Sequence, residues 1–124
     1  MKGNRSLVSI VDDDQSVCES LPDLVWEFGF AAEAFSSAEA FLASDYIDRT
    51  ECLILDVSMP GMTGPELQKE LMIRQRPIPI VFITAQWDED LRPRLIEQGA
   101  VDCLYKPFSE AALLGALSAI LKVK

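Results

Sequence analysis

Five short apolar runs recur along the sequence, and each one ends at a polar or charged residue. Runs of this length suit strands that are buried on both faces of a sheet. Between the runs the apolar residues follow helical spacing, and serine, aspartate, glycine or proline marks the ends of the segments. The expected strands cover residues 6–11, 30–35, 52–55, 80–83 and 101–105.

This alternation of five strands with five helices predicts an α/β fold, because consecutive parallel strands need a helical crossover. We expect a doubly wound (βα)5 parallel sheet with right-handed crossovers and helices on both faces. A chain of 124 residues with 49% hydrophobic content can bury one core, so we expect a single domain over residues 1–124. The helices are expected from Ser16 onward, after a cap at Ser36 or Ser37, over 65–76, over about 93–98 and after Ser109.

Two prolines fall within expected helices. Pro22 lies beyond the first turn of the first helix, where a proline costs up to about 3 kcal/mol or kinks the helix. Asp88 or Asp90 can start the fourth helix, but Pro93 restricts its regular part to about residues 93–98, before Gly99 ends it. We therefore expect the fourth helix to be short.

Polar residues follow the strands at the ends that a parallel sheet gathers on one edge. Asp12 and Asp13 follow the first strand, Asp56 the third, Thr84 the fourth and Lys106 the fifth. Open α/β sheets bind ligands at this edge, so we expect these five side chains to converge on one site.

The neighbouring Asp14 and Ser16 are better explained as helix-start residues, because both residue types favour helix N-termini.

Three converging carboxylates repel one another by roughly 4 kcal/mol per pair at about 4 Å and an effective dielectric near 20. Either one of them is protonated or a cation binds between them. Oxygen ligands with room for water suit Mg²⁺. A carboxylate nucleophile, a divalent ion, the Lys106 ammonium and the Thr84 hydroxyl are the groups that phosphoryl transfer needs, so the expected product is an aspartyl phosphate.

The composition excludes several classes of function. The net charge of −9 disfavours direct binding to nucleic acid or to anionic membranes. No signal peptide or membrane-spanning run is present, so we expect a cytoplasmic location. The absence of histidine excludes catalytic triads that use imidazole. We expect Cys18, Cys52 and Cys103 to be reduced and mostly buried, because they are odd in number and lie in apolar runs.

Four motifs carry a family resemblance: VDDD at 11–14, LILDVSMPGMTG at 53–64, ITA at 83–85 and YKPF at 105–108. In their order and spacing they resemble the receiver domain of bacterial two-component response regulators, of the CheY-like superfamily. The resemblance covers essentially the whole chain and is closest to receivers that precede helix-turn-helix output domains. It implies a flavodoxin-like, CheY-like three-layer sandwich with strand order 2-1-3-4-5.

The resemblance also implies residue roles. Asp56 would accept a phosphoryl group from the phosphohistidine of a sensor histidine kinase or phosphotransfer protein, or from a small phosphodonor. Lys106 would contact that group, Thr84 would hydrogen-bond to it, and the peptide bond between Lys106 and Pro107 would be cis. The residues implied in Mg²⁺ binding are Asp12, Asp13, Asp56 and Ser58, the last through its backbone carbonyl.

By the same resemblance, phosphorylation would change the binding surface toward an output domain or a downstream protein, in transcriptional control, and could favour a homodimer. The domain would bind neither nucleic acid directly nor membranes. It would be no enzyme beyond catalysing its own phosphorylation and dephosphorylation.

The chain departs from the family at Cys103, where receivers usually carry a tyrosine or phenylalanine that swings inward on activation. A thiol cannot make that movement. We therefore hypothesise that the signal orders a loose helix around Trp87 to Leu91 instead.

Three other functions fit parts of the sequence. Asp12 to Ser16 after an apolar strand resembles the opening of haloacid-dehalogenase-type phosphatases, which would be phosphorylated at Asp12. A flavodoxin-like flavin carrier would want a phosphate loop where this chain has three acids. A receiver-like module that binds a partner without phosphorylation is the remaining alternative, and Cys103 keeps it open.

Overall fold

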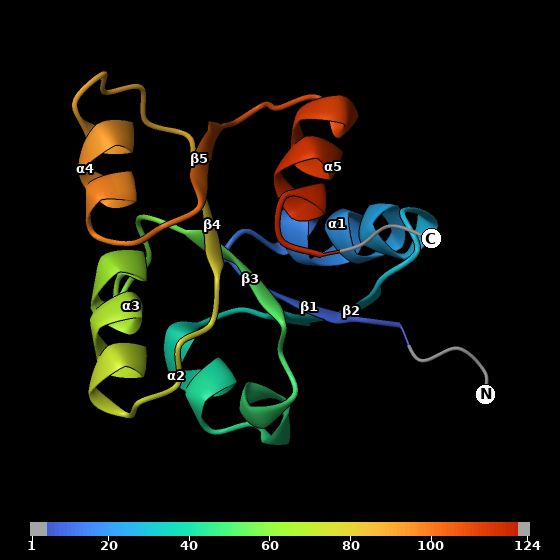
Figure 1. Cartoon of the computed structure of the whole chain (residues 1–124), viewed down its shortest axis with the longest axis horizontal. Coiled ribbons are helices and arrows are strands. Elements are labelled where there is room, and N and C mark those ends of the chain that lie inside the picture. The colour runs from blue at the N-terminus through green and yellow to red at the C-terminus, as the bar shows by residue number, and fades with distance from the viewer. Residues whose placement is uncertain (1–4, 122–124) are drawn as a thin grey trace.

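The computed structural model describes residues 5–121, in which five strands alternate with five α-helices (Figure 1). A 3-10 helix, Asp45–Asp48, lies in the segment that leads to the third strand. The strands are β1 (Leu7–Val11), β2 (Ala31–Phe35), β3 (Cys52–Asp56), β4 (Ile80–Thr84) and β5 (Asp102–Tyr105). The helices are α1 (Gln15–Glu27), α2 (Ala38–Leu42), α3 (Gly64–Ile73), α4 (Leu91–Glu97) and α5 (Glu110–Ser118).

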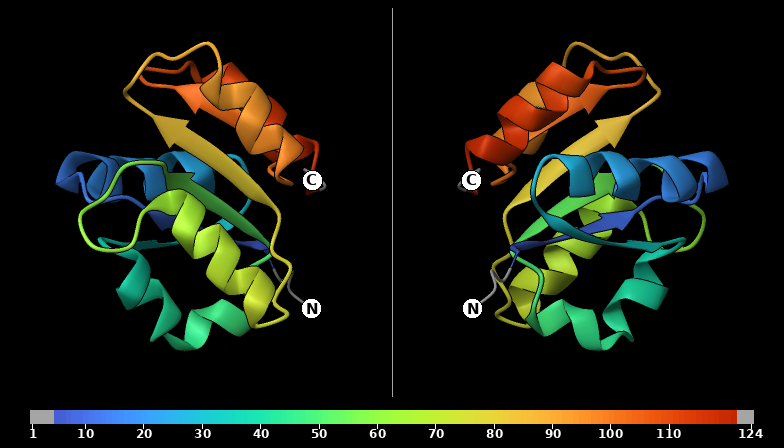
Figure 2. Two further views of the ribbon diagram at one scale, coloured as in Figure 1. Left: turned by 90° about the vertical axis from the view of Figure 1, so that its left-hand side faces the viewer. Right: turned by 90° about the vertical axis from the view of Figure 1, so that its right-hand side faces the viewer.

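The strands form one parallel sheet in the order β2-β1-β3-β4-β5, which confirms the expected fold class. Helices α1 and α5 cover one face of this sheet, and α2, α3 and α4 cover the other (Figures 1 and 2). The connection from β1 to β2 runs toward one side of the sheet, and the connections from β2 to β3, β4 and β5 run toward the other. When crossovers share one hand, this reversal of direction places helices on both faces of the sheet.

Side chains alternate across the central strands and fill two separate cores. Ile10, Ile54 and Ile83 pack toward α1 and α5. Leu55 and Phe82 pack toward α2, α3 and α4. All five side chains are fully buried, and burial of each contributes about 1.5–3 kcal/mol relative to exposure. The acidic residues at the ends of β1 and β3 are thereby fixed on a rigid frame.

Side-chain caps explain where most of the helices begin. Asp14, Ser37, Thr63 and Ser109 each accept a hydrogen bond from a backbone N–H of the first turn. At α3 the cap is reciprocal, since Glu66 also accepts the N–H of Thr63. The expected roles of Asp14 and Ser109 as capping residues are therefore confirmed.

Asp90, one of the two expected starting residues of the fourth helix, is at its N-cap position, but the regular part begins two residues before the expected Pro93. Helix α4 begins at Leu91, so Pro93 is its third residue and not its first. A proline is tolerated in the first turn, because the backbone N–H groups there have no partner within the helix. The expectation that α4 is short is confirmed, and α1 continues through Pro22 to Glu27.

The structure also shows where Asp56 lies relative to β3 and whether the three cysteines are free. Strand β3 includes Asp56, which pairs with Ile83, so the carboxylate belongs to the strand and not to the loop after it. Cys18, Cys52 and Cys103 are free thiols; Cys52 and Cys103 are buried and Cys18 is partly buried.

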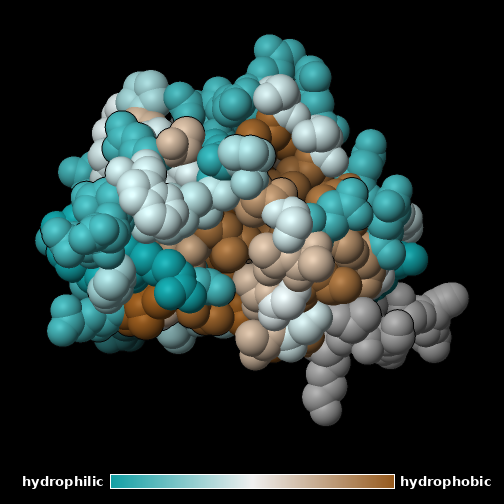
Figure 3. Space-filling view, turned by 90° about the horizontal axis from the view of Figure 1, so that it is seen from above, coloured by the Kyte–Doolittle hydropathy of each residue, from teal (hydrophilic) through white to brown (hydrophobic). Residues whose placement is uncertain are grey.

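Seen from above, hydrophilic residues surround several patches of hydrophobic surface (Figure 3). Among residues 5–121, four large apolar residues are more than half exposed, namely Trp26 at 54%, Met72 at 66%, Ile73 at 69% and Trp87 at 75%. Within residues 5–121 every helix is too short or too polar to cross a lipid bilayer.

Candidate functional site

Three carboxylates meet at the carboxyl ends of β1 and β3. One oxygen from each of Asp12, Asp13 and Asp56 lies within 4.8 Å of the other two. Asp12 is fully buried, Asp56 is 6% exposed and Asp13 faces solvent. Solvent therefore reaches the cluster at Asp13.

Lys106 supplies the positive charge of this cluster. Its Nζ donates to Oδ2 of Asp12 at 2.8 Å and lies 3.9 Å from Oδ1 of Asp56. The other Asp12 oxygen accepts the backbone N–H of Asp14 at 2.9 Å. Both oxygens of the most buried acid are thus engaged, and a single ammonium faces two carboxylates.

Burial and charge shift the protonation of both partners. Burial raises the pKa of Asp56 to about 7; the neighbouring Asp12 charge acts in the same direction, and Lys106 acts against both. Burial by itself lowers the pKa of Lys106, but its hydrogen bond to Asp12 and the charge of Asp56 outweigh that effect, so the pKa is raised overall. The site contains more negative charge than one lysine neutralises.

Thr84 is the last residue of β4 and is 1% exposed. Its hydroxyl oxygen accepts the N–H of Gln86 at 3.1 Å, and the hydroxyl hydrogen can still be donated to another group. Its carbonyl accepts the N–H of Lys106 at 2.7 Å, which ties the ends of β4 and β5 together. The peptide bond between Lys106 and Pro107 is cis, as the resemblance implied.

Ser58 lies in the loop between β3 and α3, two residues beyond Asp56, with its side chain exposed. At the end of the same loop Gly64 allows a close approach of the chain to Asp56. A Cβ at Gly64 would overlap the Asp56 carbonyl oxygen and lie 3.0 Å from the Phe82 ring. Glycine is therefore required there by the packing of the loop against β3.

Two features of this edge could not be foreseen from the periodicity. Trp87 packs against Tyr105 with ring centroids 4.5 Å apart and ring planes tilted by 46°, and the Tyr105 hydroxyl donates to the Asp88 carbonyl at 2.8 Å. Cys103 is buried two residues earlier on β5. The aromatic ring that contacts the loop after β4 thus comes from position 105 and not from position 103.

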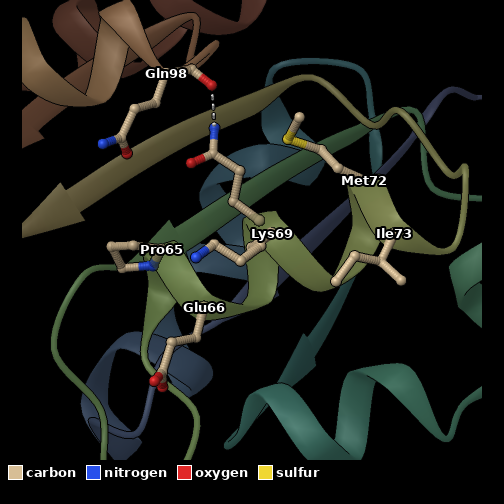
Figure 4. Close-up of a pocket in the computed structure, with 7 residues that line it drawn as sticks. Pro65, Glu66, Lys69, Met72, Ile73 and Gln98 are labelled. Atoms are coloured by element: carbon tan, nitrogen blue, oxygen red, sulfur yellow. Dashed lines mark hydrogen bonds between the residues drawn. The ribbon is translucent and has the colours of Figure 1, made fainter.

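A groove of about 730 Å³ lies along α3 and against the residue that follows α4 (Figure 4). Gln68, one of the residues that line it, donates to the Gln98 carbonyl at 3.4 Å. None of the residues that line it belongs to the acidic cluster; they are Pro65, Glu66, Gln68, Lys69, Met72, Ile73 and Gln98.

The acidic cluster fits a divalent cation by its chemistry. Three carboxylates, one of them open to water, form the hard oxygen donor set that Mg²⁺ prefers. No soft ligand such as a thiolate belongs to the set. The strand ends that hold these acids are fixed by the two cores, so the donors stay close in spite of their repulsion.

The sequence matches the family described as response regulator receiver domain over residues 8–118. It is 43% identical to the response regulator protein TodT of Pseudomonas putida over 123 residues, which is 99% of this chain and 54% of TodT. It is 41% identical to the transcriptional regulatory protein FixJ of Azorhizobium caulinodans, covering 92% of this chain and 54% of FixJ. The chain thus spans about half the length of these relatives.

Solved structures agree with these sequence matches. The response regulator StyR superimposes with a TM-score of 0.86 at 44% identity, over 95% of this chain and 60% of StyR. The structure named FixJ-N gives a TM-score of 0.80 at 34% identity, over 95% of this chain and 93% of that one. The chain belongs to the response regulator receiver domain family, a class of regulatory domains of phosphorylation-based two-component signalling.

Proposed function

We propose that this domain accepts a phosphoryl group on Asp56 in the presence of Mg²⁺ and thereby switches a transcriptional regulator. One observation carries the proposal: the Asp12, Asp13 and Asp56 carboxylates converge within 4.8 Å, and the Lys106 ammonium reaches two of them. Asp12, Asp13, Asp56 and the Ser58 carbonyl would hold the ion. When bound, the ion neutralises charge on the phosphoryl oxygens.

The proposed reaction begins with the Asp56 carboxylate as nucleophile. One of its oxygens forms a bond to phosphorus while the phosphorus–nitrogen bond to the partner's histidine breaks, and the leaving imidazole takes up a proton. Lys106, 3.9 Å from Asp56, stabilises the negative charge of the transferred group. The Thr84 hydroxyl would then donate to a phosphoryl oxygen.

The contacts of Asp12 argue against a phosphatase of the haloacid-dehalogenase type, in which Asp12 would be the nucleophile. Asp12 is fully buried, and its two oxygens already bind the Asp14 N–H and the Lys106 ammonium. Asp56 has no comparable engagement, since the nearest ammonium is 3.9 Å from it. The acceptor that the geometry favours is therefore Asp56.

A shallow groove of about 250 Å³ beside Lys106 is the proposed approach for a histidine kinase or phosphotransfer protein. It is largely apolar and borders the phosphorylation site, as a contact surface for a partner's histidine-bearing helix requires. Its lining residues are Val17, Ser20, Leu21, Lys106, Pro107 and Phe108.

The relatives suggest what the switch controls. Several carry names of transcriptional regulators, and this chain matches only about half of each. We propose that an output domain or downstream protein recognises the phosphorylated domain, and that a homodimer is one form of that recognition.

The test is to incubate the protein with acetyl phosphate and Mg²⁺ and to locate the modified residue by mass spectrometry. We expect one phosphoryl group on Asp56, none on Asp12, and none in Asp56→Asn. Omission of Mg²⁺ should abolish labelling, and Lys69→Ala on the exposed face of α3 should leave it unchanged. Labelling of Asp12, or labelling that persists in Asp56→Asn, would contradict the proposal.

A further inference from the structure

The loop between β3 and α3, residues 57–63, is fixed at both of its ends. Met59 is 6% exposed and packs in the core cluster that contains Phe41. At the far end the Gly64 N–H donates to the Val57 carbonyl at 3.0 Å. The segment between Met59 and Gly64 includes Pro60 and Gly61 and lies near the surface.

One side chain from another element holds this middle segment. Oε2 of Glu39, on α2, accepts the N–H of Met62 at 3.0 Å across 23 positions of the sequence. Gly61 lies directly beside this contact, since a Cβ at that position would be 2.9 Å from the same oxygen, at the end of the exposed Glu39 side chain. Gly61 also has φ +74°, a conformation that side chains other than glycine rarely adopt.

The position of Glu39 on α2 is itself well defined. It lies in the first turn of the helix, where a carboxylate is favoured by the helix dipole. The Ser37 side chain caps the same turn, and the neighbouring Ala38 and Phe41 are buried against the sheet. Glu39 therefore connects a fixed helix to the loop that follows Asp56.

We infer that Glu39 is a positioning residue for the metal site: it holds the loop so that the Ser58 carbonyl is directed to a divalent cation bound by Asp12, Asp13 and Asp56. The inference rests on the proposed function. A backbone carbonyl has no side-chain rotamer with which to compensate for a displaced loop, so its use as a ligand depends on the loop conformation. Groups that orient metal ligands in this way typically change metal affinity 10- to 100-fold.

Two substitutions separate the hydrogen bond from the charge. Glu39→Gln keeps an oxygen that can accept the Met62 N–H but removes the negative charge. Glu39→Ala removes both. Glu97→Ala, on the exposed end of α4 at the opposite edge of the sheet, is a control that removes one carboxylate elsewhere.

The experiment measures Mg²⁺ binding to the unphosphorylated protein by calorimetry, together with hydrogen exchange at Met62 and urea unfolding. For Glu39→Ala we expect about 10-fold weaker Mg²⁺ binding and faster exchange at Met62, with little change in unfolding. Glu39→Gln and Glu97→Ala should bind within about 2-fold of the unsubstituted protein.

Equal Mg²⁺ affinity in Glu39→Ala and the unsubstituted protein would overturn the inference. So would equal weakening in Glu39→Gln and Glu39→Ala, which would assign the effect to charge. Different results would contradict the proposed function. These are an unsubstituted protein that binds no Mg²⁺, or an Asp13→Asn variant that binds Mg²⁺ with unchanged affinity.

Discussion

The hydroxyl of Tyr105 donates to the backbone carbonyl of Asp88, 2.8 Å away, and so joins the last strand to the loop that precedes α4. Trp87 packs against the same ring at a tilt of 46°, although the residue is 75% exposed. The segment before Leu91 is therefore a loop held by an aromatic contact and not a helix. If phosphorylation orders this segment into a helix, as hypothesised, the change begins from a loop that Tyr105 and Trp87 already hold in place.

Tyr105→Phe should loosen the loop without unfolding the domain. The variant keeps the ring contact with Trp87 and loses one exposed hydrogen bond, which contributes about 0.5–1.5 kcal/mol. We expect faster hydrogen exchange over residues 86–90 and a changed Trp87 fluorescence spectrum. Tyr46→Phe is the matched control, because Tyr46 contacts Phe35 of β2, at the other end of the strand order from β5. Unchanged exchange in Tyr105→Phe would show that the hydroxyl does not hold the loop.

The pKa of Asp56 predicts how stability depends on pH in the absence of metal. Its pKa is about 7 in the folded protein and 3.8 in the unfolded reference. Between these values the unfolded chain loses this proton while the folded protein retains it, so the Asp56 contribution to stability falls as pH rises through this window. Below pH 3.8 the contribution of the Asp56 proton to stability is fully present. Above about pH 7 this contribution has been lost, and the stability does not change further on account of Asp56.

Asp56→Asn should therefore raise the free energy of unfolding at pH 8 by about 1–3 kcal/mol and have a smaller effect at pH 5. Urea unfolding in the presence of a chelator measures both values. Mg²⁺ should stabilise the unsubstituted protein more than the variant, because it binds the folded state. A variant that is less stable than the unsubstituted protein at pH 8 would contradict the raised pKa.

Removal of the Lys106 ammonium should destabilise the fold strongly. Lys106→Met keeps an apolar stem of similar length but leaves the fully buried Asp12 without its cation. Breaking a buried pair in this way costs about 3–5 kcal/mol. Lys69→Met, on the exposed face of α3, should change stability by less than about 0.5 kcal/mol. Chemical denaturation of both variants, with and without Mg²⁺, tests this, and an equal stability of the two would refute it.

Gly64→Ala should be destabilising, whereas Gly115→Ala should not. The first places a Cβ against the Asp56 carbonyl oxygen and the Phe82 ring, so the loop or β3 must shift, at a cost of about 1–3 kcal/mol. The second fills open space in the middle of α5 and should stabilise by up to about 1 kcal/mol. Thermal unfolding of the pair decides the matter: equal melting temperatures would mean that the approach of Gly64 to Asp56 is not tight.

Strands β3 and β4 were accessible from the sequence because all five residues of each are buried and because each strand ends at its polar residue, Asp56 or Thr84. Strands β1, β2 and β5 are less completely buried, but turn and helix-start residues mark their ends. The start of α4 was not, because Asp90 makes no side-chain cap and Pro93 is compatible with several starting points. Tertiary contacts hold the first turn of the helix: the partly buried Leu91 packs against the core, and Arg92 forms an ion pair with Asp102 at 2.8 Å.

In the candidate site, too, some contacts could be predicted from the sequence and others could not. Asp12, Asp56 and Lys106 could be placed together because parallel strands end on one edge. The Glu39 contact with Met62 could not, since it depends on the path of a loop that hydrophobic periodicity does not describe. The same holds for the pairing of Trp87 with Tyr105, because the exposed tryptophan gives no burial signal.

The ion pair between Asp12 and Lys106 joins positions that are 94 residues apart. During synthesis on the ribosome, Asp12 and Asp56 emerge well before the lysine that neutralises them. A nascent chain without the fifth strand carries the acids but lacks their counter-ion, so an incomplete translation product cannot assemble this centre. Because Asp12 and Lys106 are so far apart in the sequence, the domain can act in signalling only after its fold is complete.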